Sequence, residues 1–134
     1  MQKALHDAIH VPADAGELGP AIEALLRRIP DGWGRWLTME CGWYEVVADL
    51  DRRLAAIDPD YILFQAKQKF GKFVFYFEPS PPLAARWPEM DDAVAGTASR
   101  AARTCERCGS TGDDVAWRGD RFYVQTLCQQ CAAL

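Results

Sequence analysis

Cys105-Glu-Arg-Cys108, followed after nineteen residues by Cys128-Gln-Gln-Cys131, is the most informative pattern for the fold of the C-terminal part of the chain. Two thiolates three positions apart on a tight turn can supply one edge of a tetrahedron, and a second such pair can supply the opposite edge. Such a site is closed, because four protein sulfurs leave no position for water. The pattern therefore predicts one structural zinc ion per chain, bound by Cys105, Cys108, Cys128 and Cys131.

Disulfides and iron are the alternatives to zinc at these cysteines. Disulfides need an oxidising compartment, and Met1–His10 lacks the continuous apolar stretch of an export signal. The common spacings of iron–sulfur centres differ from this one, and a thioredoxin-like redox motif has a single CxxC pair. We therefore expect zinc and a cytoplasmic location. Cys41 lies outside the pattern and is predicted to be a buried, reduced thiol.

The residues around the four cysteines are typical of a zinc ribbon. Between the pairs, residues 113–117 and 121–126 are predicted to form two strands joined at Arg118-Gly119-Asp120. Gly109, directly after the second cysteine, suits the sharp backbone turn of a metal knuckle. Before the first pair, residues 88–103 predict a helix with acidic residues at its start and arginines at its end. Residues 88–134 are thus expected to form a helix followed by a zinc ribbon.

Upstream of this part, residues 79–87 form a proline-rich linker and residues 1–78 predict a small body of helices and one β-hairpin. Helices are expected over about 20–29 and about 42–57, and the hairpin over about 61–77. The second helix carries a stripe of apolar residues at helical spacing: Trp43, Val46, Val47, Leu50, Leu54 and Ile57. The predicted fold class is α+β.

The hairpin is predicted to turn at Phe70-Gly71 between strands near 61–68 and 73–77. Strict alternation gives it one apolar face, made of Ile62, Phe64, Ala66, Phe73, Phe75 and Phe77. The other face is polar, basic and partly aromatic, with Gln65, Lys67, Lys69, Lys72 and Tyr76.

Composition excludes some classes of protein. The 134 residues include five tryptophans, four tyrosines and six phenylalanines, enough for one globular body with a small appendage. No apolar run approaches the ~20 residues of a membrane span, and the net charge of −4 argues against a general nucleic-acid coat. The sequence has two histidines, both near the N-terminus, and neither a nucleophile elbow nor a glycine-rich phosphate loop. We therefore expect a protein that is not an enzyme.

Several of these motifs together resemble a family of short, uncharacterised bacterial and phage proteins. They are Cys41-Gly-Trp-Tyr44, Gln65-Ala-Lys-Gln-Lys-Phe-Gly71 with Phe75-Tyr76, Cys105-x-x-Cys108-Gly109, and Thr126-Leu-Cys128-x-x-Cys131. The similarity covers about residues 40–131. This chain has one glycine before Trp43 where the family often has two, and Gln68 where it often has glutamate. The resemblance implies a shape and a habitat in bacteria or their phages, and it implies no activity.

The predicted function is that of a non-enzymatic, zinc-stabilised binding protein that docks on another protein. By analogy with other small acidic phage proteins, the partner would be a bacterial host enzyme or defence complex, inhibited in an anti-CRISPR-like manner. The alternative is a nucleic-acid-binding zinc ribbon, since lysines beside an aromatic side chain can contact phosphate and stack a base. The candidate binding surface consists of Lys67, Lys69, Lys72, Tyr76, Arg118 and Arg121.

Overall fold

Helices and two small antiparallel hairpins make up the chain, so the fold mixes α and β structure. The computed structural model describes residues 3–81 and 83–134. In chain order, the elements are α1 (Lys3–His6), α2 (Gly19–Leu26), α3 (Tyr44–Ile57), β1 (Ile62–Lys69), β2 (Lys72–Glu78), α4 (Trp87–Ala101), β3 (Ala116–Gly119), β4 (Val124–Leu127) and α5 (Gln129–Ala132). Short 3-10 helices occupy Gly16–Leu18, Cys41–Trp43 and Leu83–Arg86.

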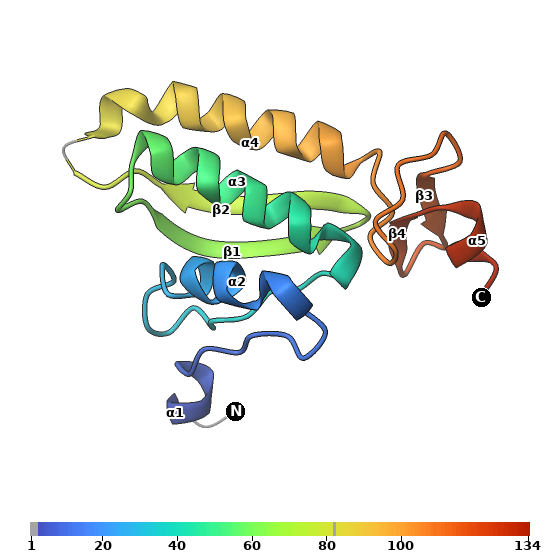
Figure 1. Cartoon of the computed structure of the whole chain (residues 1–134), viewed down its shortest axis with the longest axis horizontal. Coiled ribbons are helices and arrows are strands. Elements are labelled where there is room, and N and C mark those ends of the chain that lie inside the picture. Colours follow the sequence, from blue (N-terminus) through green and yellow to red (C-terminus); the bar gives the residue numbers. More distant parts are fainter. Residues whose placement is uncertain (1–2, 82) are drawn as a thin grey trace.

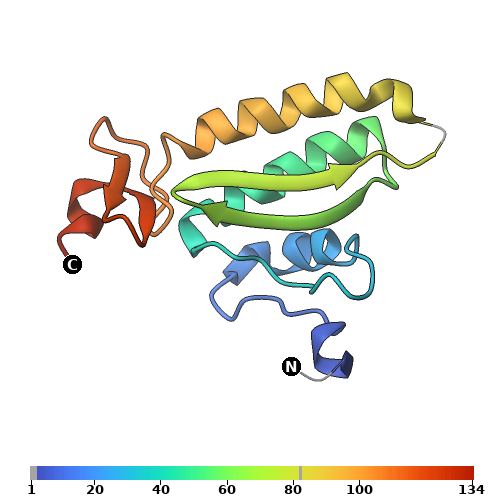
Figure 2. The ribbon, with the colours of Figure 1, turned by 180° about the vertical axis from the view of Figure 1, so that it is seen from behind.

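The long hairpin β1–β2 is the centre of the larger part of the molecule, which we call the body (residues 3–81 and 83–103). Helices α3 and α4 lie side by side over one face of the hairpin, and α2 packs against α3 (Figure 1). The opposite face of the hairpin has no helix in front of it among the described residues (Figure 2). The second hairpin, β3–β4, and α5 lie beyond the tip of the first, and we call residues 104–134 the cysteine module (Figure 1).

The core of the body lies between the helices and the hairpin. Helix α3 contributes most of the predicted stripe, with Leu50 and Leu54 fully buried, and Trp43 of the preceding 3-10 helix is fully buried as well. Leu25 and Leu26 of α2 and Met90 of α4 close the core from two sides. Its other large members are Ile22, Ile29, Tyr44, Val46, Val47, Tyr61, Leu63, Phe73 and Phe75.

A β-bulge in β1 changes which residues face this core. Leu63 pairs with Phe77 and Gln65 pairs with Tyr76, so Phe64 has no partner across the hairpin. The prediction that Ile62 and Phe64 face the core is therefore wrong, and the fully buried Leu63 takes that place beside Ala66. Strict alternation fails at the bulge because one extra residue reverses the side to which the preceding side chains point. Phe64 instead packs on Trp33, with 4.8 Å between ring centroids.

The tip of the long hairpin is a two-residue turn at Phe70 and Gly71, as the sequence predicts. Both residues have positive φ, of 53° and 80° respectively, which is the conformation that a tight hairpin turn requires. Lys69 pairs with Lys72 across this turn. The turn therefore presents the Phe70 side chain to solvent and brings two lysines together next to the cysteine module.

Three boundaries differ from the sequence prediction. Helix α2 ends at Leu26, although Ile29 is still buried. The strands of the second hairpin lie three residues farther along the chain than expected at their starts, because Asp120 accepts hydrogen bonds from the Phe122 and Tyr123 N–H groups and shapes the turn. The predicted linker 79–87 includes the 3-10 helix Leu83–Arg86 and the start of α4, and Pro82 lies outside the described residues.

Candidate metal centre

The four predicted ligands come together in one cluster. Their sulfur atoms all lie within 4.8 Å of one another. Cys105 and Cys108 belong to the loop after α4, whereas Cys128 follows β4 and Cys131 lies in α5. The Sγ atoms of Cys108 and Cys128 are 3.7 Å apart. A tetrahedral site with metal–sulfur bonds of about 2.3 Å has edges of about 3.8 Å, so this spacing fits a four-sulfur metal centre.

The local backbone explains how the two pairs present their sulfurs. The Gly109 N–H donates to the Cys105 carbonyl at 2.8 Å, and the Cys105 N–H donates to the Ser110 carbonyl at 2.8 Å. Gly109 closes this turn with a φ of 80°, which glycine adopts without strain. In the second pair, the Cys131 N–H donates to Cys128 Sγ at 3.4 Å. Such an N–H bond stabilises a thiolate, which is the form of cysteine that binds metal.

The electrostatics of the cluster favour a bound cation. Hydrogen bonds from Ser110 lower the pKa of Cys108 to about 6. Burial raises the pKa of Cys131 to about 12, and the hydrogen bonds with neighbouring thiols add to the effect. One thiol of the cluster thus ionises readily, while another resists adding a further negative charge. A divalent cation at the centre removes that resistance, because it neutralises the thiolates.

The cluster holds free thiols rather than disulfides. All five cysteines of the chain are unpaired, and 3.7 Å between Cys108 and Cys128 is far longer than the ~2.05 Å of a disulfide bond. With four protein sulfurs around one ion, no coordination position is left for a substrate or water. The arrangement can therefore hold a metal ion, such as zinc, in a structural role.

Cys41 lies outside the cluster and contradicts its prediction. Its side chain is exposed, not buried. The residue opens the 3-10 helix Cys41–Trp43 at the edge of the body, where its thiol donates to the Arg107 carbonyl at 3.4 Å. Cys41 is exposed because it lies at the rim of the contact between the body and the cysteine module. The neighbouring Trp43, and not Cys41, occupies the core.

The Cys41-Gly-Trp-Tyr44 motif receives the first cysteine loop. A Cβ on Gly42 would lie 2.2 Å from the Cys105 carbonyl oxygen and 2.5 Å from that of Glu106, so only glycine permits this approach. The Trp43 indole N–H donates to the Thr104 carbonyl at 2.8 Å within the buried interface. The motif and the cysteines are thus two sides of one contact.

A second contact joins the cysteine module to the hairpin tip. The Thr126 hydroxyl donates to the Gly71 carbonyl at 2.6 Å, and both groups are buried. Trp117 and Val124 lie close enough to Gly71 that a Cβ there would be 3.1 Å from each side chain. The Lys-Phe-Gly turn of the hairpin is therefore also part of the junction.

Sequence reasoning missed a polar network beneath the first cysteine loop. Glu106 is buried and accepts a hydrogen bond from the Glu40 N–H at 2.9 Å. Gln125 donates to the carboxylates of both Glu40 and Glu106, and Arg107 pairs with Glu40. Burial raises the pKa of Glu106. Nothing in the local sequence signals this network, because its members come from three separate segments of the chain, at Glu40, at Glu106 and Arg107, and at Gln125.

The predicted binding residues do not form one uniform patch. Lys67 lies over the Tyr76 ring at 5.4 Å, on the hairpin face opposite to α3 and α4. Lys72 lies over the Trp117 ring at 5.4 Å and so points toward the cysteine module. Arg118 donates to the carbonyls of Leu127 and Asp114, at 3.0 and 2.6 Å, and thereby braces the module itself.

The exposed aromatic side chains of the cysteine module and hairpin tip were not predicted as a binding surface. Phe122 is 76% exposed, Phe70 65%, Trp117 58% and Tyr123 57%. Arg121, the remaining predicted residue, stacks on Phe122 with 4.8 Å between its guanidinium and the ring centroid. The sequence does indicate these exposed rings in one way, because large aromatic residues at or beside a short hairpin turn lie at the end of a hairpin, away from the core.

Among residues 3–81 and 83–134, no helix combines the length and apolar character needed to cross a membrane. Comparison of this chain with protein-family models, with curated proteins and with solved structures gave no match in any of the three.

Proposed function

We propose that the chain is a binding protein stabilised by one structural zinc ion, and that it acts by docking on another protein. The observation that carries this proposal is the closed cluster of four cysteines, whose sulfurs lie within 4.8 Å of one another. Between the two pairs is the short hairpin β3–β4, which is the layout of a zinc ribbon. A closed centre holds a fold together and offers no position for catalysis.

Zinc fits this centre better than the alternatives. Cys-x-x-Cys pairs separated by nineteen residues match the spacing of two-knuckle zinc sites. The Cys108–Cys128 separation of 3.7 Å fits zinc–sulfur bonds of about 2.3 Å in a tetrahedron. Metal analysis of the full chain, purified without chelators, distinguishes zinc from iron directly.

The docking part of the proposal rests on the exposed aromatic side chains. Phe122 and Tyr123 at the turn of β3–β4 are both more than half exposed. Large aromatic side chains are enriched at protein interfaces, where they contribute much of the binding energy. They are not part of the small buried cluster of the cysteine module, which consists mostly of the cysteines. We expect them to become buried when the partner binds.

A capture experiment with matched variants tests the docking function. The immobilised, metal-loaded chain is exposed to a bacterial lysate with and without nuclease. We expect a captured protein that is still retained after nuclease treatment. It should be lost with Phe122→Ser and kept with Trp87→Ser, because Trp87 is an exposed aromatic residue at the start of α4, at the end of the body away from the cysteine module. Retention by both variants, or no nuclease-resistant protein, would contradict docking through this surface.

A nucleic-acid-binding protein is the second candidate. The observation that favours it is the pairing of lysines with exposed rings, Lys67 with Tyr76 and Lys72 with Trp117. Phosphate contacts release counterions, so binding of a labelled single-stranded oligonucleotide should weaken as salt increases. Absence of binding at low salt excludes this candidate. Salt-dependent binding that Lys67→Ala weakens would favour it over protein docking.

The narrower hypothesis of a phage-derived inhibitor rests on the resemblance of residues 40–131 to a family of bacterial and phage proteins and on analogy with small acidic phage proteins. A purified partner identified by capture allows a direct test. The activity of that partner should fall when the metal-loaded chain is added in equal amount, and it should not fall with the Phe122→Ser variant.

A further inference from the structure

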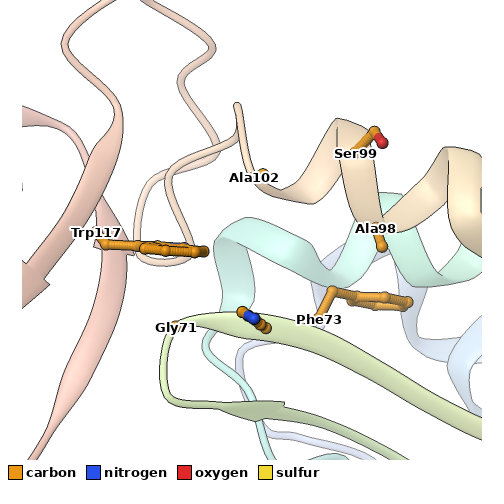
Figure 3. Close-up of a pocket in the computed structure, with 7 residues that line it drawn as sticks. Gly71, Phe73, Ala98, Ser99, Ala102 and Trp117 are labelled. Atoms are coloured by element: carbon orange, nitrogen blue, oxygen red, sulfur yellow. The ribbon is translucent and has the colours of Figure 1, made fainter.

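A cavity of about 270 Å³ opens where the body meets the cysteine module (Figure 3). Its walls come from three separate parts of the chain. The hairpin tip supplies Gly71, Lys72 and Phe73, helix α4 and the residue after it supply Ala98, Ser99 and Ala102, and β3 supplies Trp117. Figure 3 shows the Trp117 and Phe73 rings edge-on, one reaching from the module and the other rising from β2.

The lining chemistry suits a flat aromatic group. The helix side of the cavity bears only small side chains, and the facing surfaces are the rings of Phe73 and Trp117. Trp117 lines the cavity and is 58% exposed, so part of its indole surface is available to a ligand. Aromatic rings pack favourably against each other in offset or edge-to-face arrangements. An aromatic side chain inserted here would cover apolar surface that now faces solvent.

The positive charge at the cavity favours a ligand that carries an acidic group next to that aromatic group. Lys72 lines the cavity, and its ammonium lies 5.4 Å from the centre of the Trp117 ring. Lys69 pairs with Lys72 across the turn, and residues 61–77 contain no acidic side chain. An acidic group next to the inserted ring would therefore meet an uncompensated positive charge.

We propose that this cavity receives an aromatic side chain of a partner protein, with an adjacent acidic residue of that partner meeting Lys72. The proposal rests on the proposed docking function and names the chemistry of the partner at one site. A partner protein fits better than a nucleic acid, because Lys72 is the one charged side chain among the lining residues and the chain carries a net charge of −4.

The cavity also depends on the metal centre. Trp117 belongs to the cysteine module, whereas the other walls belong to the body. The hydrogen bond from Thr126 to the Gly71 carbonyl holds the two parts together beside it. A chain without metal should consequently lose the Trp117 wall and, with it, the binding of the aromatic group.

A peptide titration of the full, metal-loaded chain tests the proposal. The probe is acetyl-Gly-Phe-Asp-Asp-Gly-amide, added to ¹⁵N-labelled protein and followed by the shifts of the Gly71 amide and the Trp117 indole N–H. We expect saturable shifts at both groups. Replacing phenylalanine of the probe by leucine, or both aspartates by asparagine, should each weaken binding several-fold.

Two variants, one at Ala102 directly after α4 and one at Ala95 within it, separate binding in the cavity from binding elsewhere. Ala102→Leu fills the cavity from an exposed position, and we expect it to weaken peptide binding by about tenfold through the lost ring contact. Ala95→Leu adds the same side chain at an exposed position outside the lining and should leave binding unchanged.

The proposal is overturned if no saturable shift occurs at Gly71 and Trp117, or if Ala102→Leu binds the peptide as tightly as the unchanged protein. It is also overturned if an oligothymidylate, and not the peptide, binds in an Ala102→Leu-sensitive manner. Failure of this titration together with a partner that Phe122→Ser loses would leave the docking function standing. Peptide binding in the cavity without any captured protein would instead support the cavity and contradict the docking function.

Discussion

In the body, α2, α3, α4 and the long hairpin share one continuous apolar core, whereas the buried apolar cluster of the cysteine module consists mostly of cysteines. Its members are Leu127 and three of the four cysteines, with Val115 packed partly against them. Removing apolar surface from water drives folding in proportion to the area buried. The module buries too little apolar surface for this, whereas its four clustered cysteines could hold a metal ion that would stabilise it instead.

The largest effect should follow loss of one ligand from the module. With Cys128→Ser we expect residues 104–134 to unfold while α3 stays folded, because a structural zinc site contributes on the order of 10 kcal/mol to folding. Hydrogen exchange measured segment by segment checks this. Cys41→Ser is the matched control, since Cys41 is exposed and outside the cluster. Unchanged protection of the module in Cys128→Ser would show that it does not need the metal.

A core substitution that creates a cavity in the body should destabilise the body and leave the cysteine module intact. Leu50 is fully buried in α3, so Leu50→Ala should lower the free energy of unfolding of the body by about 2–5 kcal/mol. The metal content should remain that of the unchanged chain, since the ligands lie elsewhere. Glu45→Ala, at an exposed position of α3, serves as the control. Loss of metal from Leu50→Ala under folding conditions would mean that the two parts are not stabilised separately.

The junction between the two parts can be disturbed at Gly42. An added Cβ would collide with the Cys105 and Glu106 carbonyl oxygens, so Gly42→Ala should destabilise the docked arrangement by about 1–3 kcal/mol. Thermal unfolding of the metal-loaded chain measures the loss. Gly96→Ala is the control, because a Cβ at Gly96 in α4 meets no atom within 4 Å and alanine favours a helix. Equal unfolding temperatures for the two variants would contradict the described contact.

The smallest effect concerns a carboxylate of the body. Burial alone would raise the pKa of Asp58, but hydrogen bonds from Ser80 and from the Asp60 N–H outweigh burial and hold the pKa below its ordinary 3.8. Since the folded pKa is the lower one, this stabilisation is present above about pH 4 and is lost as the pH falls through the folded pKa.

The matching variant is Asp58→Asn, which keeps one acceptor oxygen. It should lower the stability of the body at pH 7 by about 1 kcal/mol and reduce its loss of stability in acid. Denaturant unfolding of α3 and the long hairpin at pH 7 and pH 3.5 measures both effects. The same acid dependence in the variant and the unchanged chain would show that Asp58 does not contribute.

Much of the fold followed from local patterns in the sequence. The apolar stripe around Leu50 and the Phe70-Gly71 turn gave elements close to the observed ones, because both depend on residues near each other in the chain. The bulge at Phe64 could not be predicted, since register is set by pairing across the hairpin and by the core behind it. The exposure of Cys41 likewise could not be predicted, because its surroundings include the first cysteine loop at Arg107, which is 66 residues away along the sequence.

The candidate site was predictable only in part for the same reason. Four cysteines at knuckle spacing indicate a metal centre without any structure. The roles of Gly42 and Trp43 in receiving the first cysteine loop appear only when the two segments are seen in contact. Arg118 was assigned to a binding surface from its charge, yet its guanidinium donates to carbonyl groups within the module.

The proposed metal centre can be tested by native mass spectrometry of the full chain combined with X-ray absorption at the metal edge. We predict one zinc ion per chain, surrounded by four sulfur atoms at about 2.3 Å. This set of ligands should be disrupted in Cys128→Ser and kept in Cys41→Ser. A chain that is fully folded without metal, or a metal bound through nitrogen or oxygen ligands, would contradict this prediction.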